Sequence, residues 1–436
     1  MSVPPAPSGS SGSAYSPGGP YPHYTAATPH LVPGQRRNRG MLLGVVIAII
    51  MAVAGLTIFG IVYKQTGTAG FAWGTGLSFI PMIVIAALYL WLDRYEPEPA
   101  KTVAFAFCWG AFIATLVALF INTEAAHLLG ETRGGGSRAA VFVAPPVEEF
   151  AKGMVILLLA LVRRKEFDGI VDGLVYAGMV GIGFAFTENV LYIGRIYQAA
   201  ADAGGDQEGL RSSLALFILR GGISPFAHPL FTSFTAIGIG IAVRHRSTVV
   251  RFLAPITGYL CAVLAHSLWN GFATLLPPGG FLLFYLLLMV PLFISMVVFA
   301  LVMRSRESQM IASRLYDYVR FGWILPQDVP FVATLRGRRA LRQHAKRTGP
   351  DGEAAAKYFQ RTATELAYLR DKIVRQVIGG DALQTEKQLL DELRQRRPGV
   401  PFPPMPAYAA PSVGTPAGPA GYGPPGPGYG PYPPSR

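Results

Sequence analysis

Four apolar stretches of the sequence contain ionisable side chains whose types suit the activation of water. These side chains are the adjacent pair Glu148 and Glu149, then Glu188, His228 and His266. Glutamate and histidine are ligand types for a divalent cation such as zinc, and a glutamate outside the coordination sphere can serve as a general base. Because an ionisable group within a long apolar stretch is energetically costly, each of these residues is a candidate functional residue.

Two neighbouring residues extend this chemistry. Lys152 follows Glu148 by one helical turn and shares its face, where an ammonium group can balance the paired carboxylates. Asn270 shares a face with His266, and an amide can stabilise an oxyanion. A structural ion pair or a helix–helix hydrogen bond would account for any one of these groups, but the complete set favours hydrolysis.

The composition around these residues is that of a membrane protein. Hydrophobic residues make up 51% of the 436 residues and charged residues only 14%, which excludes an ordinary soluble enzyme. We expect an all-α, polytopic bundle of about eight transmembrane helices, because eight apolar segments approach the ~20 residues that cross a bilayer. The segments are 41–63, 74–92, 102–122, 139–162, 169–194, 222–243, 251–276 and 280–303.

Clusters of arginine and lysine lie at alternate ends of these spans. They precede the first span and follow the fourth, sixth and eighth, whereas the other loops contain few basic residues. This asymmetry predicts that both termini are cytoplasmic in a bacterial-type cell membrane. Counted from the outward ends, Glu148, Glu188, His228 and His266 lie roughly 9–15 Å deep at 1.5 Å per residue. We therefore predict that they converge on one layer.

The chain divides into four regions. Residues 1–40 and 398–436 are rich in proline and glycine, and we expect both tails to be disordered. Residues 41–303 form the membrane core. Residues 304–397 carry 19 Lys/Arg against 11 Asp/Glu, and their apolar spacing predicts a helical cytoplasmic segment. Such a basic segment favours contact with anionic lipid headgroups, with a protein-docking role as the alternative, and no motif indicates nucleic-acid binding.

Two further features of the fifth span concern packing. Asp168 and Asp172 lie at its cytoplasmic end and are typical of a helix start. Gly178, Gly181 and Gly183 predict the close approach of a neighbouring helix.

The motifs in these spans resemble those of the PrsW family of intramembrane proteases, which belongs with the CAAX-prenyl-protease and bacteriocin-processing superfamily. The series extends over about residues 75–300, and the loop at 93–99 also resembles the family. The motifs are Glu148-Glu149-x-x-Lys152, Phe184-x-x-x-Glu188-Asn189, His228-Pro229 and His266-x-x-x-Asn270.

The resemblance implies an intramembrane endopeptidase that cuts a membrane-anchored protein near its outward face, such as an anti-sigma factor or a similar regulator. It implies catalytic positions at Glu148, Glu149, Glu188, His266 and Asn270. A catalytically idle scaffold or receptor built on the same core, and a proton- or cation-coupled transporter, are the alternatives.

The resemblance also implies a division of roles within the site. We expect Glu148 to be the general base and Asn270 to lie on the oxyanion side. The expected ligands of a divalent metal, zinc being the first choice, are Glu188, His228 and His266. A metal-free mechanism, in which glutamate activates water directly, stays open.

Overall fold

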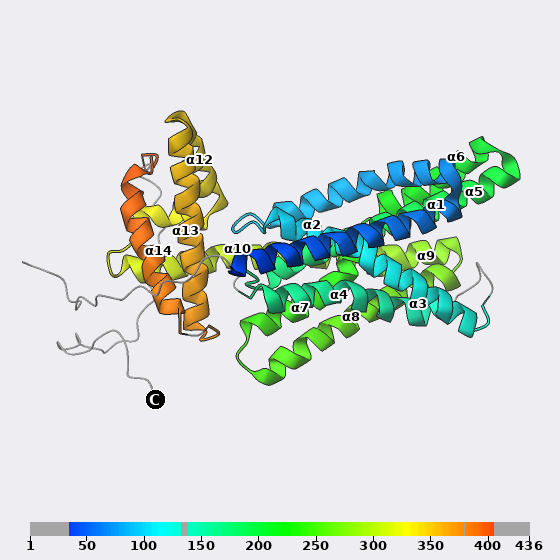
Figure 1. The fold of residues 1–436 in the computed structure, drawn as a ribbon, viewed down its shortest axis with the longest axis horizontal. Coiled ribbons are helices and arrows are strands. Elements are labelled where there is room, and N and C mark those ends of the chain that lie inside the picture. The colour runs from blue at the N-terminus through cyan, green and yellow to red at the C-terminus, as the bar shows by residue number, and fades with distance from the viewer. Residues whose placement is uncertain (1–34, 132–137, 165, 379, 405–436) are drawn as a thin grey trace, which may run out of the picture. The chain divides into compact units, whose positions relative to one another are not determined.

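The computed structural model describes residues 35–131, 138–164, 166–378 and 380–404 (Figure 1). These residues form helices joined by short loops and contain no β-strand, which confirms the all-α expectation. The tail segments 1–34 and 405–436, which we expect to be disordered, lie outside the described residues, whereas residues 35–40 of the expected N-terminal tail are helical and begin the first helix. Residues 35–49 form a unit of their own at the start of the first helix.

The helices of the membrane core follow one another with four π-helical turns between them. They are α1 (Gln35–Leu92), α2 (Ala100–Cys108), η1 (Trp109–Ala114), α3 (Thr115–Leu128), η2 (Ala139–Val143), α4 (Ala144–Val162), α5 (Ile170–Gly204), α6 (Asp206–Phe217), η3 (Ile218–Ile223), α7 (Ala227–Arg244), α8 (Thr248–Leu275), α9 (Pro278–Phe284), η4 (Tyr285–Met289) and α10 (Val290–Val319).

About eight spans cross the membrane, as the sequence predicts. Six stretches of described helix are long and apolar enough to do so: 44–92, 100–128, 170–204, 206–244, 248–275 and 278–319. The first of them contains two arms, because the φ angle of +65° at Gly67 interrupts α1. Phe59 and Phe71, on either side of this break, pack with ring centroids 6.2 Å apart. Helix α4 adds the last span, in which the charged motif interrupts the apolar run.

Helix α5 lies at the centre of the core and is the most deeply buried of the long helices. Its glycines allow neighbouring helices to approach closely, as expected. A Cβ atom at Gly181 would lie 2.7 Å from the backbone of Pro229 in α7, and one at Gly183 would lie 2.1 Å from the carbonyl oxygen of Phe107 in α2. The backbones therefore pack in direct contact, which places the start of α7 against the middle of α5.

The sixth span begins earlier than the sequence predicts. We expected it at 222–243, but helix begins at Asp206, and α5 likewise continues to Gly204 instead of ending near 194. Helix α6 folds back along α5, so that Ser213 Oγ contacts the Ile193 carbonyl oxygen at 3.5 Å. Hydropathy misses α6 because its composition is polar, whereas packing against α5 keeps it in the bundle.

Residues 304–404 form a helical C-terminal module. Helix α10 runs without a break through the boundary expected at 303/304, and it is followed by α11 (Val329–Ala333), α12 (Leu335–Arg347), α13 (Pro350–Val374) and α14 (Ala382–Arg396). These helices share an apolar core that includes Leu315, Leu341 and Leu366. Residues 398–404, which we assigned to a disordered tail, continue the module, and Phe402 packs on Phe331 and Phe359.

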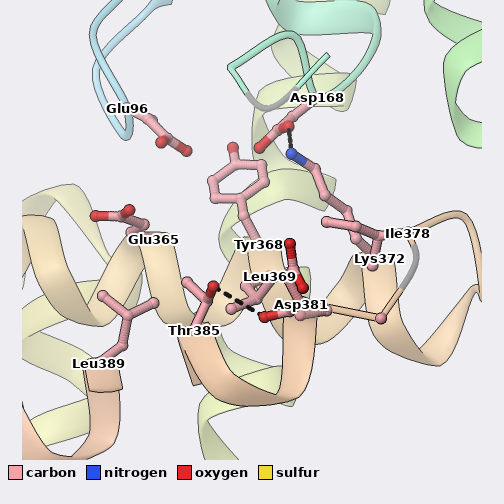
Figure 2. Close-up of a pocket in the computed structure, with 12 residues that line it drawn as sticks. Glu96, Asp168, Glu365, Tyr368, Leu369, Lys372, Ile378, Asp381, Thr385 and Leu389 are labelled. Atoms are coloured by element: carbon pink, nitrogen blue, oxygen red, sulfur yellow. Dashed lines mark hydrogen bonds and ion pairs between the residues drawn. The ribbon is translucent and has the colours of Figure 1, made fainter. Parts of the chain in front are cut away.

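The module contacts the membrane core at the end that we predict to be cytoplasmic. Lys372 of α13 pairs with Asp168, next to a cavity of about 410 Å³ that Glu96, Glu365 and Asp381 also line (Figure 2). Arg244, the last residue of α7, pairs with Asp371 at 3.1 Å. These ion pairs join the module to the helices that carry the polar residues of the core.

The predicted helix start at Asp168 and Asp172 is confirmed. Asp172 Oδ2 accepts hydrogen bonds from the backbone N–H groups of Asp168 and Gly169, at 2.5 and 3.1 Å. Burial raises the pKa of Asp168 to about 6, although the neighbouring Lys372 ammonium opposes this shift. In the facing loop, burial raises the pKa of Glu98 to about 9, so that its carboxyl group is neutral at pH 7.

Candidate active site

The paired glutamates are positioned by a π-helical turn that two prolines cause. Pro145 and Pro146 have no backbone N–H, so carbonyl groups of η2 lose their usual helical donors. The Asn270 amide of α8 compensates by donating to the Ala140 carbonyl oxygen at 2.8 Å. This hydrogen bond attaches the start of α4 to α8. It thereby sets the position of Glu148 along the axis of the bundle.

Glu149 is completely buried and accepts three hydrogen bonds of equal length. The donors are Lys152 Nζ, Thr232 Oγ1 and His266 Nδ1, each at 2.9 Å. A carboxylate with three donors in a dry site has little capacity left for a substrate. Its role is to orient His266 and to balance the charge of Lys152.

His266 and Glu148 face each other through atoms that lack a proton. Because His266 donates its Nδ1–H to Glu149, the Nε2 atom carries the lone pair. This Nε2 lies 3.8 Å from Glu148 Oε2, which is buried and has no hydrogen-bond partner. The other oxygen, Glu148 Oε1, accepts from Asn122 Nδ2 at 3.2 Å. Glu148 Oε2 also forms an ion pair with Lys152 Nζ at 3.5 Å, so this buried place already favours a positive charge.

His228 links this pair to a second group of charges. Its Nδ1 lies 3.1 Å from Lys152 Nζ, and its Nε2 lies 2.7 Å from Glu188 Oε2. Both contacts are satisfied when Nε2 carries the proton. The same Glu188 oxygen accepts from Arg220 at 2.5 Å, and Arg220 Nε donates to Asn189 at 2.7 Å. Glu188 is therefore held by a guanidinium and an imidazole.

Glu148, His228 and His266 are the residues that fit a metal ion. Each offers one ligand atom, and these atoms lie within 4.8 Å of one another in a buried setting. One carboxylate and two imidazoles form a donor set that zinc accepts, with a further position for water or substrate. The bond between Glu149 and His266 is the kind of outer contact that fixes a ligating histidine. Glu148 Oε2, which makes no hydrogen bond, supports this fit, and His228 would ligate through Nδ1 in place of its contact with Lys152.

The structure thus brings together the residues that the sequence singles out, but it distributes them differently. Glu148 lies in the donor cluster, where we expected the base, whereas Glu188, an expected ligand, pairs with Arg220 and His228 beside the cluster. The donor of Asn270 is engaged by the Ala140 carbonyl oxygen instead of facing the cluster.

Two polar residues of the site were not predicted from the sequence. Asn122 lies at the end of an expected span, and Arg220 lies just before one, so neither counted as an intramembrane polar group. A helical pattern that began at Asp206 would have placed Arg220 within the bundle.

Comparison with known proteins agrees with this geometry. Residues 98–296 match the model of the family described as PrsW family intramembrane metalloprotease. The chain is 32% identical over 117 residues to Protease PrsW of Clostridioides difficile (strain 630), covering 27% of this chain and 49% of the relative. It is 31% identical over 113 residues to Protease PrsW of Bacillus subtilis (strain 168), covering 26% and 50%.

The chain thus spans about half the length of the curated relatives that it matches. No solved structure matches it. The matched region contains α4, α5, α7 and α8, which carry the donor cluster and its surrounding carboxylates. With its multi-pass membrane core, the region of residues 98–296 is similar to the PrsW family of intramembrane metalloproteases.

Proposed function

We propose that this protein is an intramembrane endopeptidase that cuts a membrane-anchored protein near the face opposite its own cytoplasmic termini. A regulator held in the membrane, such as an anti-sigma factor, is the substrate class we favour. One observation carries the proposal. Within residues 98–296, Glu148 Oε2, which makes no hydrogen bond, lies 3.8 Å from His266 Nε2, and His228 completes a buried donor set.

In this proposal, Glu148, His228 and His266 hold a divalent cation, for which zinc is our choice. When bound, such an ion supplies a Lewis acid that polarises the substrate carbonyl and makes water easier to deprotonate. Glu149 keeps His266 in the tautomer whose Nε2 is free to ligate. Asn122 orients Glu148 by donating to its other oxygen.

Glu188 is the carboxylate that we assign to proton transfer. It lies next to the donor set through its 2.7 Å contact with His228, and its side chain is 15% exposed, against 7% for Glu148. Glu188 is therefore the carboxylate nearer the surface of the helix bundle. Glu188 accepts a proton from the attacking water and passes it to the amine that leaves when the C–N bond breaks. Glu148 and Glu188 thereby exchange the roles expected from the sequence.

The C-terminal module would face the cytoplasmic membrane surface in this orientation. Residues 304–397 contain 19 basic and 11 acidic residues, and this positive net charge supports contact with anionic lipid headgroups.

The experiment compares Glu148→Gln and Glu188→Gln with the wild type in cells and after purification. Glu124→Gln, a change of an exposed glutamate on α3, is the matched control. Metal content per protein is measured after purification, and membrane-protein fragments are compared at equal expression. We expect Glu148→Gln to lose both the metal and the cleavage, because it removes a ligand. Glu188→Gln should retain the metal and lose cleavage.

Other outcomes separate the alternatives. Fragments that are the same in the wild type and in a folded Glu148→Gln variant would refute the peptidase and favour the scaffold. Cation or proton flux into wild-type vesicles, without fragments, would favour the transporter. Loss of metal from Glu188→Gln but not from Glu148→Gln would restore the role division expected from the sequence.

A further inference from the structure

Arg220 is the most accessible charged group of the active-site network. Its side chain is 25% exposed, compared with 15% for Glu188 and 10% for His228, whereas Lys152 and Glu149 are fully buried. Exposure thus decreases stepwise from Arg220 through Glu188 and His228 to the buried donors. Arg220 therefore lies on the side of the site that is nearest the surface of the helix bundle.

The position of Arg220 results from the fold of α6 and η3. Because α6 packs antiparallel to α5, the π-helical turn after it lies beside Glu188 and Asn189. The central carbon of the guanidinium also lies 4.5 Å from the centroid of the Tyr192 ring. This cation–π contact restricts the orientation of the guanidinium plane. The guanidinium is thus held in place beside Glu188.

The other donors near the cluster are already engaged. The Asn270 amide donates to the Ala140 carbonyl oxygen. The Lys152 ammonium makes hydrogen bonds with Glu149 at 2.9 Å and His228 at 3.1 Å, and it forms an ion pair with Glu148 at 3.5 Å. A guanidinium has five N–H groups, and the bonds of Arg220 to Glu188 and Asn189 use two of them.

We propose that Arg220 is the catalytic residue that binds the carbonyl oxygen of the scissile peptide bond and stabilises its negative charge during hydrolysis. This inference rests on the proposed peptidase function. The bonds from Arg220 and from His228 end on the same oxygen of Glu188, so the guanidinium and the donor set are neighbours. A substrate carbonyl next to Glu188 would meet the N–H groups of Arg220 that Glu188 and Asn189 leave free.

Water, Glu188 and Arg220 account for every bond and proton in the hydrolysis. The oxygen of water forms a bond to the carbonyl carbon, and its proton moves to Glu188. The negative charge that develops on the carbonyl oxygen is met by N–H groups of Arg220. When the C–N bond breaks, the carbonyl re-forms and Glu188 returns the proton to the leaving amine. Arginine suits this role because its planar donors remain charged and are only weakly hydrated.

The test measures kcat, KM and metal content for Arg220→Lys and Arg220→Gln, with Arg211→Gln as the matched control. Arg211 lies on α6 with its side chain 82% exposed. The probe is a synthetic single-span peptide that carries the cleavage site found by fragment comparison. A second probe is the phosphonamidate analogue of that peptide, which mimics the tetrahedral intermediate.

For Arg220→Lys we expect kcat to fall by about 10²–10³-fold, as for loss of an oxyanion donor, with KM within about threefold. Metal content should be unchanged, and inhibition by the phosphonamidate should weaken by a factor similar to the loss of kcat/KM. Arg220→Lys keeps the positive charge beside Glu188. This variant alone is therefore sufficient for the test if Arg220→Gln does not fold.

Three results would overturn the proposal. In the first, kcat stays within about threefold of the wild type in both variants. In the second, metal content falls together with kcat, so that Arg220 acts only by positioning Glu188 and His228. In the third, the wild type itself does not cut the peptide, which refutes the peptidase function and this inference with it. The wild-type measurement distinguishes the third result from the others.

Discussion

The same Glu→Gln change at two adjacent positions should have very different effects on stability. Glu149 is 0% exposed and accepts hydrogen bonds from Lys152, Thr232 and His266, each at 2.9 Å. Removing its charge leaves the fully buried ammonium of Lys152 with weaker compensation. Breaking a buried ion pair from one side costs about 3–5 kcal/mol. We therefore expect Glu149→Gln to lower the free energy of unfolding by about that amount.

Glu148→Gln should cost much less. Glu148 Oε2 has no hydrogen-bond partner, and the bond from Asn122 to Oε1 can be kept by the glutamine oxygen. Lys152 loses its 3.5 Å ion pair with Glu148 but retains the closer 2.9 Å pair with Glu149. The expected loss is about 1 kcal/mol or less, the scale of one ordinary hydrogen bond.

Thermal unfolding of the purified protein in detergent measures this difference. At matched metal-free conditions, Tm should fall strongly for Glu149→Gln and only slightly for Glu148→Gln. The double variant Glu149→Gln/Lys152→Met removes both charges and should recover most of the lost Tm. Equal Tm changes at the two positions, or a double variant that is less stable than Glu149→Gln, would refute the ion-pair reasoning.

Three further predictions concern the rest of the fold. Lys372→Asp should break the pair with Asp168 and expose the C-terminal module to limited proteolysis, and the exchanged pair Asp168→Lys/Lys372→Asp should restore resistance; continued cleavage of the exchanged pair would argue against this contact. Burial raises the pKa of Glu98 to about 9, so the fold favours the neutral acid and stability decreases as pH rises from about 4.5 towards 9. Glu98→Gln should therefore gain about 1–2 kcal/mol over the wild type between pH 5 and pH 8, after allowance for partial exposure, and a Tm difference independent of pH would contradict this. Gly183→Ala should cost about 1–3 kcal/mol, because its Cβ would lie 2.1 Å from a backbone oxygen, whereas Gly76→Ala, with open space, should not lower Tm.

Much of the architecture could be predicted because hydropathy and charge act locally. Apolar runs near 20 residues must hide their backbone in helices within a bilayer, which is why about eight spans could be located. The same reasoning predicted Glu148, Glu188, His228 and His266 as candidate functional residues, since an ionisable group in such a run needs a partner.

The limits of a span were harder to predict where composition and packing disagree. Helix α6 is polar, and only its contacts with α5 hold it in the bundle, so the sixth span was expected at 222 instead of 206. Arg220 consequently appeared to precede a span, although it lies beside Glu188. Tertiary contacts also decide where a tail begins. Phe402 lies in the expected tail but packs on Phe331.

The sequence by itself determined which chemical groups enter the membrane and roughly at what depth, because these follow from the order of residues along each helix. Only the tertiary structure decided which groups face one another. Rotation of a helix by one residue, ~100°, changes its neighbours completely, and this rotation is set by backbone contacts such as Gly181 on Pro229. That is why Glu148, and not Glu188, joins the two histidines, and why the donor of Asn270 is used by the carbonyl group that Pro145 leaves without a partner.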